Sequence, residues 1–447
     1  MVHMASGSHS VFTRILSNTG VLITGRVVNA VCSFVYVAWT AQTLGLDAFG
    51  VMILVTTFAS LVSDITHLQS WQALLHYGTA PFSQKKYDQF YNILAFCVRA
   101  DFLSGAVGMI CGLGAIMLVG PVFLGWPDSI KPDALLCMLT ILFMNTGWST
   151  GMLRLCNRFK LVTFYEFITT CVRTGGCGIG YLLHLGLGYF LFVWCATQLT
   201  MFLSCTCAGL YLLRKQTGAF LPMRTLLSPV RNVPGIWKFT LSTSVNQVLE
   251  SVFQQGGTLV IGAVLGAGEA AVYRVARQIS NGLSKPAQMM LPTLYPEFIR
   301  FRDKQDWQGM RQVTLKLFGL IAAFSILVFL LTVTVGNSLF SYMLHHSWPG
   351  QKTILVLLVS SALLDIGLVP LEPLLTVLGQ IAMVLRARIT VIAVYFPLLY
   401  VLLLQWGVDG AALSSVLASF LMLLVCGIPV FSFLCGRENK KGLSIFK

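Results

Sequence analysis

The sequence predicts an all-α polytopic membrane protein with about 12 transmembrane helices in two six-helix lobes around a central cavity. Three observations predict this class. Of the 447 residues, 56% are hydrophobic and only 10% are charged, and the mean hydropathy is +0.78. Apolar runs long enough to cross a bilayer follow one another along the whole chain. Glycine-rich junctions between these runs recur at one fixed spacing.

Each predicted helix is a run of mainly apolar residues, because roughly 20 such residues are needed to span the hydrocarbon layer. The runs lie at 19–44, 49–77, 91–119, 134–156, 161–186, 188–212, 237–265, 270–296, 314–336, 352–378, 389–406 and 409–435. Almost no sequence is left for a soluble domain, so we expect the function to lie inside the membrane.

Residues 1–10 are short and polar, without the pattern of a cleaved signal peptide.

Several other sequence features predict no cofactor, metal or nucleotide site. Cys205 and Cys207 have neither zinc nor redox spacing, which favours a packing role. His345 and His346 fall in a predicted outer loop without cysteine or carboxylate neighbours, so a solvated loop is expected. The sequence has no P-loop, which argues against a fused ATPase.

The basic residues are distributed unequally between the predicted loops. With the N-terminus in the cytoplasm, roughly three quarters of the 30 Lys and Arg residues fall in inner segments. The predicted outer loops hold only Lys131 and Lys352. Positive charge gathers on the cytoplasmic side of membrane proteins, so both termini are expected to be cytoplasmic. The formal net charge of +14 then follows from topology and does not indicate nucleic-acid binding.

The chain also repeats itself. Gly45 joins the first two predicted helices and Gly266 the seventh and eighth, while Gly186 and Gly407 join the fifth to the sixth and the eleventh to the twelfth. The separation from Gly45 to Gly266 along the sequence equals the separation from Gly186 to Gly407. We therefore expect parallel repeats: a lobe at 1–212, a basic cytoplasmic linker at 213–236, and a lobe with a cytoplasmic tail at 237–447.

Polar residues mark one face of several helices in this repeat. At about 100° per residue, the eighth helix places its basic and amide side chains along one stripe: Arg274, Arg277, Gln278, Asn281, Lys285 and Gln288. The first and seventh helices add Arg26, Asn29, Tyr36 and Gln254. A cation within the bilayer is costly unless it faces protein or water, so these residues predict a cationic cavity that receives an anionic substrate.

Mutual neutralisation offers a structural alternative for the intramembrane charges. Arg99 and Arg173 also lie in predicted spans, together with Asp64, Asp101, Glu166, Glu250, Asp365 and Glu372. Ion pairs among these residues would need no cavity. Four of the carboxylates, Glu166, Glu250, Asp365 and Glu372, are alternatively candidates for H⁺ or Na⁺ coupling. Pro370 and Pro373 favour the site near Asp365 and Glu372, since proline frees backbone carbonyls.

Short motifs spread along the chain carry a family resemblance. They are Leu44-Gly45…Phe49-Gly50, Ser63-Asp64…Trp71-Gln72-Ala73-Leu74, Leu265-Gly266…Tyr273, Pro292 and Gly407-Val408-Asp409-Gly410-Ala411-Ala412. In this order they resemble the Wzx-type polysaccharide and O-antigen flippases of the multidrug/oligosaccharidyl-lipid/polysaccharide (MOP) exporter superfamily.

The resemblance implies a V-shaped bundle in the bacterial inner membrane. It also implies movement of undecaprenyl-diphosphate-linked oligosaccharide to the periplasmic leaflet, alongside other polysaccharide-assembly membrane proteins. For the cationic cavity we expect alternating access, in which the cavity faces first the cytoplasm and then the periplasm. A multidrug or metabolite exporter of the same superfamily is the alternative, although an acidic cavity would suit cationic drugs better. A membrane polymerase or glycosyltransferase is disfavoured, because the predicted outer loops are too short for an active site. No enzyme activity is therefore expected.

Overall fold

The structure, a computed structural model, describes residues 5–123, 130–219, 222, 225–226, 233–288, 298–344 and 350–434. Within these ranges the regular secondary structure is entirely helical. The chain divides into two compact units, Met1–Leu259 and Val260–Lys447, which are described separately. The predicted division into lobes at the basic linker 213–236 stays a prediction. His345, His346 and Pro292 lie outside the described residues.

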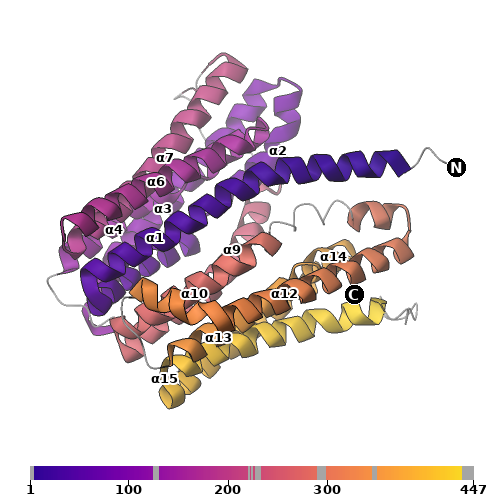
Figure 1. Cartoon of the computed structure of the whole chain (residues 1–447). Coiled ribbons are helices and arrows are strands. Elements are labelled where there is room, and N and C mark those ends of the chain that lie inside the picture. Colours follow the sequence, from indigo (N-terminus) through magenta and orange to yellow (C-terminus); the bar gives the residue numbers. More distant parts are fainter. Residues whose placement is uncertain are drawn as a thin grey trace. The chain divides into compact units, whose positions relative to one another are not determined.

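The first unit is a bundle of long helices (Figure 1). Helix α6 packs against α1 and α7, and α3 packs against α2 and α4. Its elements are α1 (Ala5–Thr66), α2 (Ser70–Ser83), α3 (Tyr87–Phe123), α4 (Lys131–Met144), α5 (Gly147–Leu155), α6 (Phe159–Leu182), α7 (Leu187–Thr217) and most of α9 (Ile236–Leu265).

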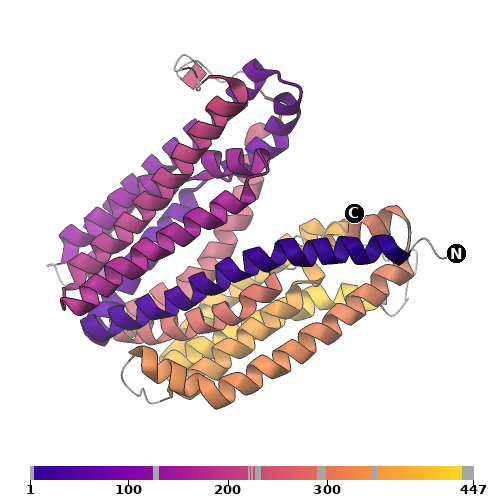
Figure 2. The same cartoon turned by 45° about the horizontal axis from the view of Figure 1, so that its top comes forward.

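The second unit is built around one helix, α13, which packs against α10, α12, α14 and α15. The orange and yellow helices of this unit can be followed in Figure 2. Its elements are α10 (Ala267–Gln288), α12 (Trp307–Leu344), α13 (Gln351–Leu368), α14 (Leu371–Val377) and α15 (Ile381–Leu434).

The described residues contain 8 segments that are long and apolar enough to cross a membrane. Two of them, Val28–Ser83 and Ala382–Phe431, each cover two predicted spans. They bend at Gly45 (φ 75°) and Gly407 (φ 58°), the glycines that the sequence places at junctions. The fifth and eighth predicted spans correspond to α6 and α10, which are not among the 8. The membrane class is confirmed, while the count of 12 helices stays a prediction.

Three of the helices predicted to be continuous are broken. The second breaks at residues 67–69, the fourth at 145–146 and the tenth at 369–370. Pro370 explains the last break, because it lacks a backbone N–H. At the first break Gln69 N donates to Ser244 Oγ on α9 (3.0 Å), so tertiary contacts satisfy backbone groups that the break frees. Hydropathy does not reveal such breaks.

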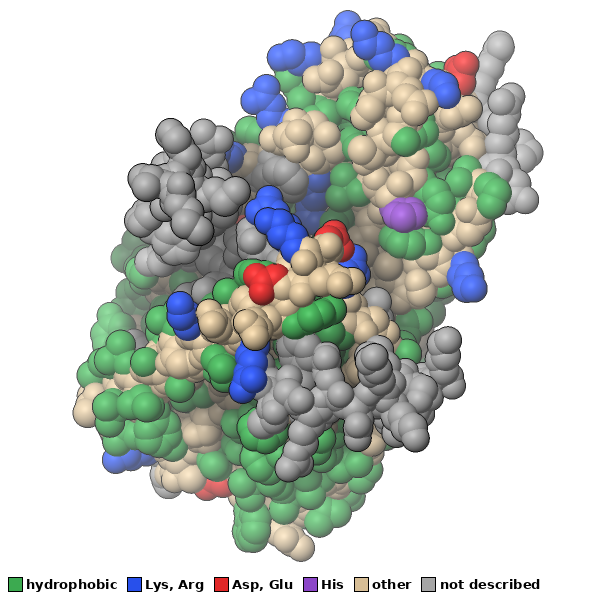
Figure 3. Space-filling view, turned by 90° about the vertical axis from the view of Figure 1, so that its right-hand side faces the viewer, with side chains coloured by type: hydrophobic (Ala, Val, Ile, Leu, Met, Phe, Trp, Pro, Cys, Tyr) green, Lys and Arg blue, Asp and Glu red, His purple; other side chains and the backbone are tan. Residues whose placement is uncertain are grey.

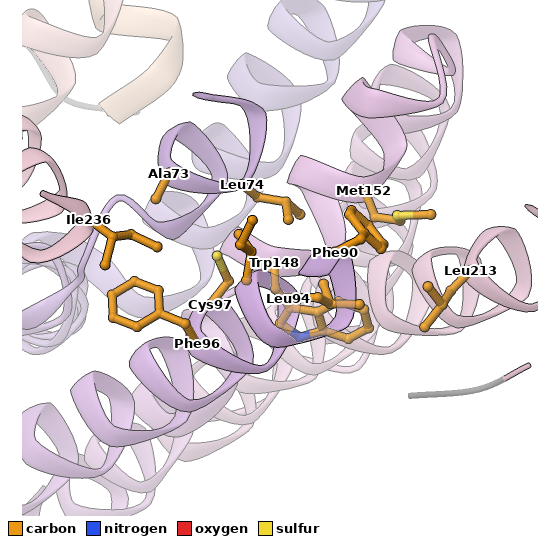
Figure 4. Packing of buried hydrophobic residues seen from close by; sticks show 11 residues of the cluster. Ala73, Leu74, Phe90, Leu94, Phe96, Cys97, Trp148, Met152, Leu213 and Ile236 are labelled. Atoms are coloured by element: carbon orange, nitrogen blue, oxygen red, sulfur yellow. The ribbon is translucent and has the colours of Figure 1, made fainter. Parts of the chain in front are cut away.

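The core of the first unit lies where α2, α3, α5, α7 and α9 meet. Figure 4 shows its buried side chains, including Leu74, Phe90, Trp148 and Leu213. Many large apolar side chains lie instead on the outside, among them Leu118, which is 80% exposed. Figure 3 shows such side chains in green, mostly in the lower part of the view, with Lys and Arg in blue at the top and centre. An apolar exterior around a packed interior is what a lipid environment requires.

Gly45 offers a test of the bend in α1. A Cβ at Gly45 would meet no atom within 4 Å, and the same is true at Gly114 within α3. Of these two glycines, Gly45 has a positive φ of 75° and Gly114 does not. We expect Gly45→Ala to destabilise the protein by about 1–3 kcal/mol through backbone strain, because φ 75° with ψ 171° is a conformation that essentially only glycine adopts. The matched Gly114→Ala should be neutral or stabilising by up to about 1 kcal/mol. Thermal unfolding in detergent micelles measures both, and equal effects would contradict the strain at Gly45.

Candidate functional site

The basic helix α10 places one arginine deep in the second unit. Arg277 is only 6% exposed. Its Nη1 donates to Tyr273 Oη at 2.9 Å and lies 3.4 Å from Ser415 Oγ on α15. Tyr273 Oη and Ser415 Oγ are themselves hydrogen-bonded at 3.0 Å. The guanidinium is thus held by neutral hydroxyl groups from two helices.

Further neighbours of Arg277 come from α13 and α15. Asp365 on α13 and Tyr395 on α15 both interact electrostatically with Arg277. Two serines tie the same helices together, since Ser361 Oγ on α13 lies 2.9 Å from Ser419 Oγ on α15. Asp365 is thus an acid of the second unit that approaches Arg277. In this structure the charge of Arg277 lies inside a packed polar network, and its role in a cavity stays a prediction.

The other predicted cavity residues are distributed between the two units. Arg274 and Asn281 are half-buried on α10 in the second unit. In the first unit Asn29 and Tyr36 on α1 and Gln254 on α9 are half-buried. The guanidinium of Arg173 on α6 lies over the Tyr36 ring, 4.4 Å from its centroid. The side chains of Arg26, Lys285 and Gln288 lie outside the described residues.

The four predicted coupling carboxylates have different surroundings. Glu372 in the first turn of α14 forms an ion pair with Arg388 on α15 at 2.8 Å. Asp365 shares the network of Arg277. Glu166 on α6 and Glu250 on α9 are exposed. Within the described ranges, no three His, Cys, Asp or Glu side chains gather in a way that could hold a metal ion.

The first unit contains a second buried polar cluster that the sequence analysis did not assemble. Asp101 on α3 is 3% exposed, and its Oδ2 accepts the backbone N–H of Trp148 at the start of α5 (2.6 Å). Asn145, between α4 and α5, contacts His67, which lies between α1 and α2. The sequence signal was present, since Asp101 is an acid within a predicted span and His67 lies on a polar face. Only the fold brings the two helix breaks together.

The chain is similar to a known protein family and to a known membrane protein. The family model described as polysaccharide biosynthesis protein matches residues 15–302. The Escherichia coli K12 protein called inner membrane protein YghQ is 27% identical over 338 residues, which cover 74% of this chain and 92% of that protein.

Solved structures share the fold. An inward-facing multidrug resistance MATE family transporter of the MOP superfamily has a TM-score of 0.73 at 13% identity, over 92% of this chain and 96% of that one. The lipid II flippase MurJ, in an inward closed conformation, has a TM-score of 0.64 at 12% identity, over 92% and 89%. A MOP superfamily transporter from Pyrococcus furiosus, described as having a binding pocket of reverse polarity, has a TM-score of 0.59 at 12% identity, over 92% and 93%.

The network around Arg277 can be tested by removing one hydroxyl. Tyr273→Phe deletes the group that bonds both Arg277 and Ser415, and leaves a buried cation with fewer partners. We expect destabilisation of about 1–3 kcal/mol, read as a lower thermal unfolding midpoint. Tyr400→Phe is the matched control, because Tyr400 lies on the same unit and is 52% exposed. An unchanged midpoint in Tyr273→Phe would show that the network contributes nothing to stability.

Proposed function

We propose that this chain, which belongs to the polysaccharide biosynthesis protein family, is a flippase for lipid-linked oligosaccharides. It is a multi-pass inner membrane protein with the fold of MOP superfamily transporters, and it is not an enzyme. Its cargo is an undecaprenyl-diphosphate-linked repeat unit, which moves from the cytoplasmic to the periplasmic leaflet for cell-surface polysaccharide synthesis. Both termini are cytoplasmic.

The observation that carries the cargo assignment is the cationic helix α10 within this family. A diphosphate head group is anionic, and arginine binds phosphate through planar, paired donors. Arg274 and Asn281 are seven residues apart on α10, so they lie on one face, and both are half-buried. They are the proposed contacts for phosphate and sugar. Arg277 lies one turn from each, and its fixed charge adds to the positive potential of that face.

The fold alone does not separate a glycan flippase from a multidrug exporter, because transporters of both kinds share it. The family match and the basic character of α10 favour the glycan. In the proposed cycle the basic face meets the cargo from the cytoplasm and releases it to the periplasm by alternating access between the lobes 1–212 and 237–447. Counterflow of H⁺ or Na⁺ drives the movement.

Glycan analysis in cells tests this function. A deletion strain should accumulate lipid-linked repeat units inside the cell, and the wild-type gene should restore surface glycan. Arg274→Glu should lower export by at least about tenfold, since one reversed charge in a desolvated phosphate site costs well over 1.4 kcal/mol.

Arg302→Glu serves as the control for Arg274→Glu. Arg302 lies on the exposed segment between α10 and α12 and pairs with Asp303 at 3.1 Å, where side chains are largely solvated. Protein amount in the membrane is measured for each variant. Normal surface glycan in the deletion strain would exclude the flippase assignment, and full export by Arg274→Glu would exclude the contact on α10.

A further inference from the structure

We propose that Asp101, with His67 beside it, is the proton-binding site that couples the first unit to a pH gradient. This inference rests on the proposed transport function for its purpose, but not for the binding of the proton. None of the four carboxylates that the sequence predicts for ion coupling belongs to this site. The site lies where the break in the second predicted helix meets the break in the fourth.

Asp101 has one satisfied and one unsatisfied oxygen. Its Oδ2 accepts the Trp148 N–H, which lies at the positive N-terminal end of α5. Its Oδ1 is fully buried and has no hydrogen-bond partner among the described residues, and the same holds for Ser70 Oγ. Both atoms lie against Gly147, where an added Cβ would clash with Ser70 Oγ and would approach Asp101 Oδ1 to 2.9 Å. The Ser70 hydroxyl can donate to Oδ1 when Asp101 is ionised and can accept from it when Asp101 is protonated, so the pair accommodates both states of the carboxyl group.

Asn145 determines which ring nitrogen of His67 is a hydrogen-bond donor. The Asn145 Nδ2 donates to the Asp101 carbonyl oxygen at 3.0 Å and to Ser104 Oγ at 2.9 Å. Its Oδ1 therefore faces His67 as an acceptor, so His67 Nδ1 carries a proton. His67 is half-buried, which places it at the accessible edge of the cluster.

Few other ionisable groups face this pair. Asp64 on α1 interacts with His67 and accepts Gln255 Nε2 from α9 at 2.7 Å. Cys97 on α3 faces Asp101 and donates to the Ser70 carbonyl oxygen at 3.4 Å. The other groups next to Asp101 and His67 are neutral: Ser70 on α2, Asn145 between α4 and α5, and the backbone N–H of Trp148 on α5. Nearby arginines are engaged elsewhere, since Arg154 lies over the Trp71 ring at 3.9 Å and Arg99 donates to Thr225 O at 2.6 Å.

The chemistry of the cluster favours a proton over a sodium ion. Hard cations such as Na⁺ take several oxygen ligands at once. Of the described side-chain oxygens of Asp101, Ser70 and Asn145, two lack a hydrogen-bond partner, Asp101 Oδ1 and Ser70 Oγ, because Asp101 Oδ2 already accepts Trp148 N and Asn145 Oδ1 faces His67. A proton needs only one acceptor and one neighbour. The cluster offers that arrangement.

The position of Asp101 gives the proton a mechanical consequence. The ionised carboxylate holds the N-terminus of α5, and a negative charge there is favoured by the helix dipole. Protonation removes the charge and weakens that hold. Asn145 and His67 connect the Asp101 backbone to the break between α1 and α2. Gain or loss of one proton at Asp101 therefore changes the stability of the helix arrangement at both breaks.

Infrared difference spectroscopy on the purified protein in nanodiscs tests proton binding without any cargo. In the difference spectrum between acidic and alkaline buffer, the wild type should show a C=O band from a buried protonated carboxyl group. Asp101→Asn can still accept Trp148 N–H but cannot titrate, so the band should disappear. His67→Gln keeps a donor for Asn145 and should shift the pH at which the band appears. Asp303→Asn, at an exposed carboxylate, should leave it unchanged.

Cargo flux in proteoliposomes then separates this inference from the proposed function. An imposed pH gradient should stimulate lipid-linked glycan transport in the wild type and in Asp303→Asn, and not in Asp101→Asn. A band that persists in Asp101→Asn would overturn the proton site whatever the cargo is. Loss of the band in Asp101→Asn, with no glycan transport by any variant, would confirm the proton site and exclude the proposed cargo.

Discussion

The structure depends on one constraint: every backbone polar group within a bilayer must find its partner inside the protein. Unbroken helices meet it by themselves, but this chain interrupts three of its predicted spans. At those places side chains from other helices take over, as Asp101 does for Trp148 N and Ser244 for Gln69 N. The breaks are therefore positions at which polar side chains from neighbouring helices are buried and can take part in ionic chemistry.

The two units manage buried charge in different ways. In the second unit a permanent cation, Arg277, is surrounded by the hydroxyl groups of Tyr273 and Ser415 with Asp365 nearby. In the first unit a carboxylate, Asp101, is held by the backbone N–H of Trp148. Arginine stays charged under all physiological conditions, whereas a carboxylate can be neutralised by one proton. A fixed charge suits attraction of an anionic cargo, and a removable charge suits coupling.

Both functional assignments concern the same physical cost. Taking a diphosphate or a proton into a low-dielectric region is favourable only where compensating groups are already in place. Arg274 and Asn281 on α10 are the groups proposed for the cargo, and Ser70 and the Trp148 N–H are those next to the Asp101 carboxyl group. The family membership and the MOP-type fold support transport, while the chemistry of these side chains supports the particular substrate and ion.

The sequence alone determined the membrane class, the junctions at Gly45 and Gly407, and the basic face of α10, because hydropathy, glycine and helical periodicity are local properties. It also identified the family correctly. Only the tertiary structure decided that Arg277 lies within a hydroxyl network, that Glu372 pairs with Arg388, and that His67 meets Asn145 beside Asp101. These pairings join residues on different helices, and their geometry depends on how broken helices pack, for which a linear pattern carries no signal.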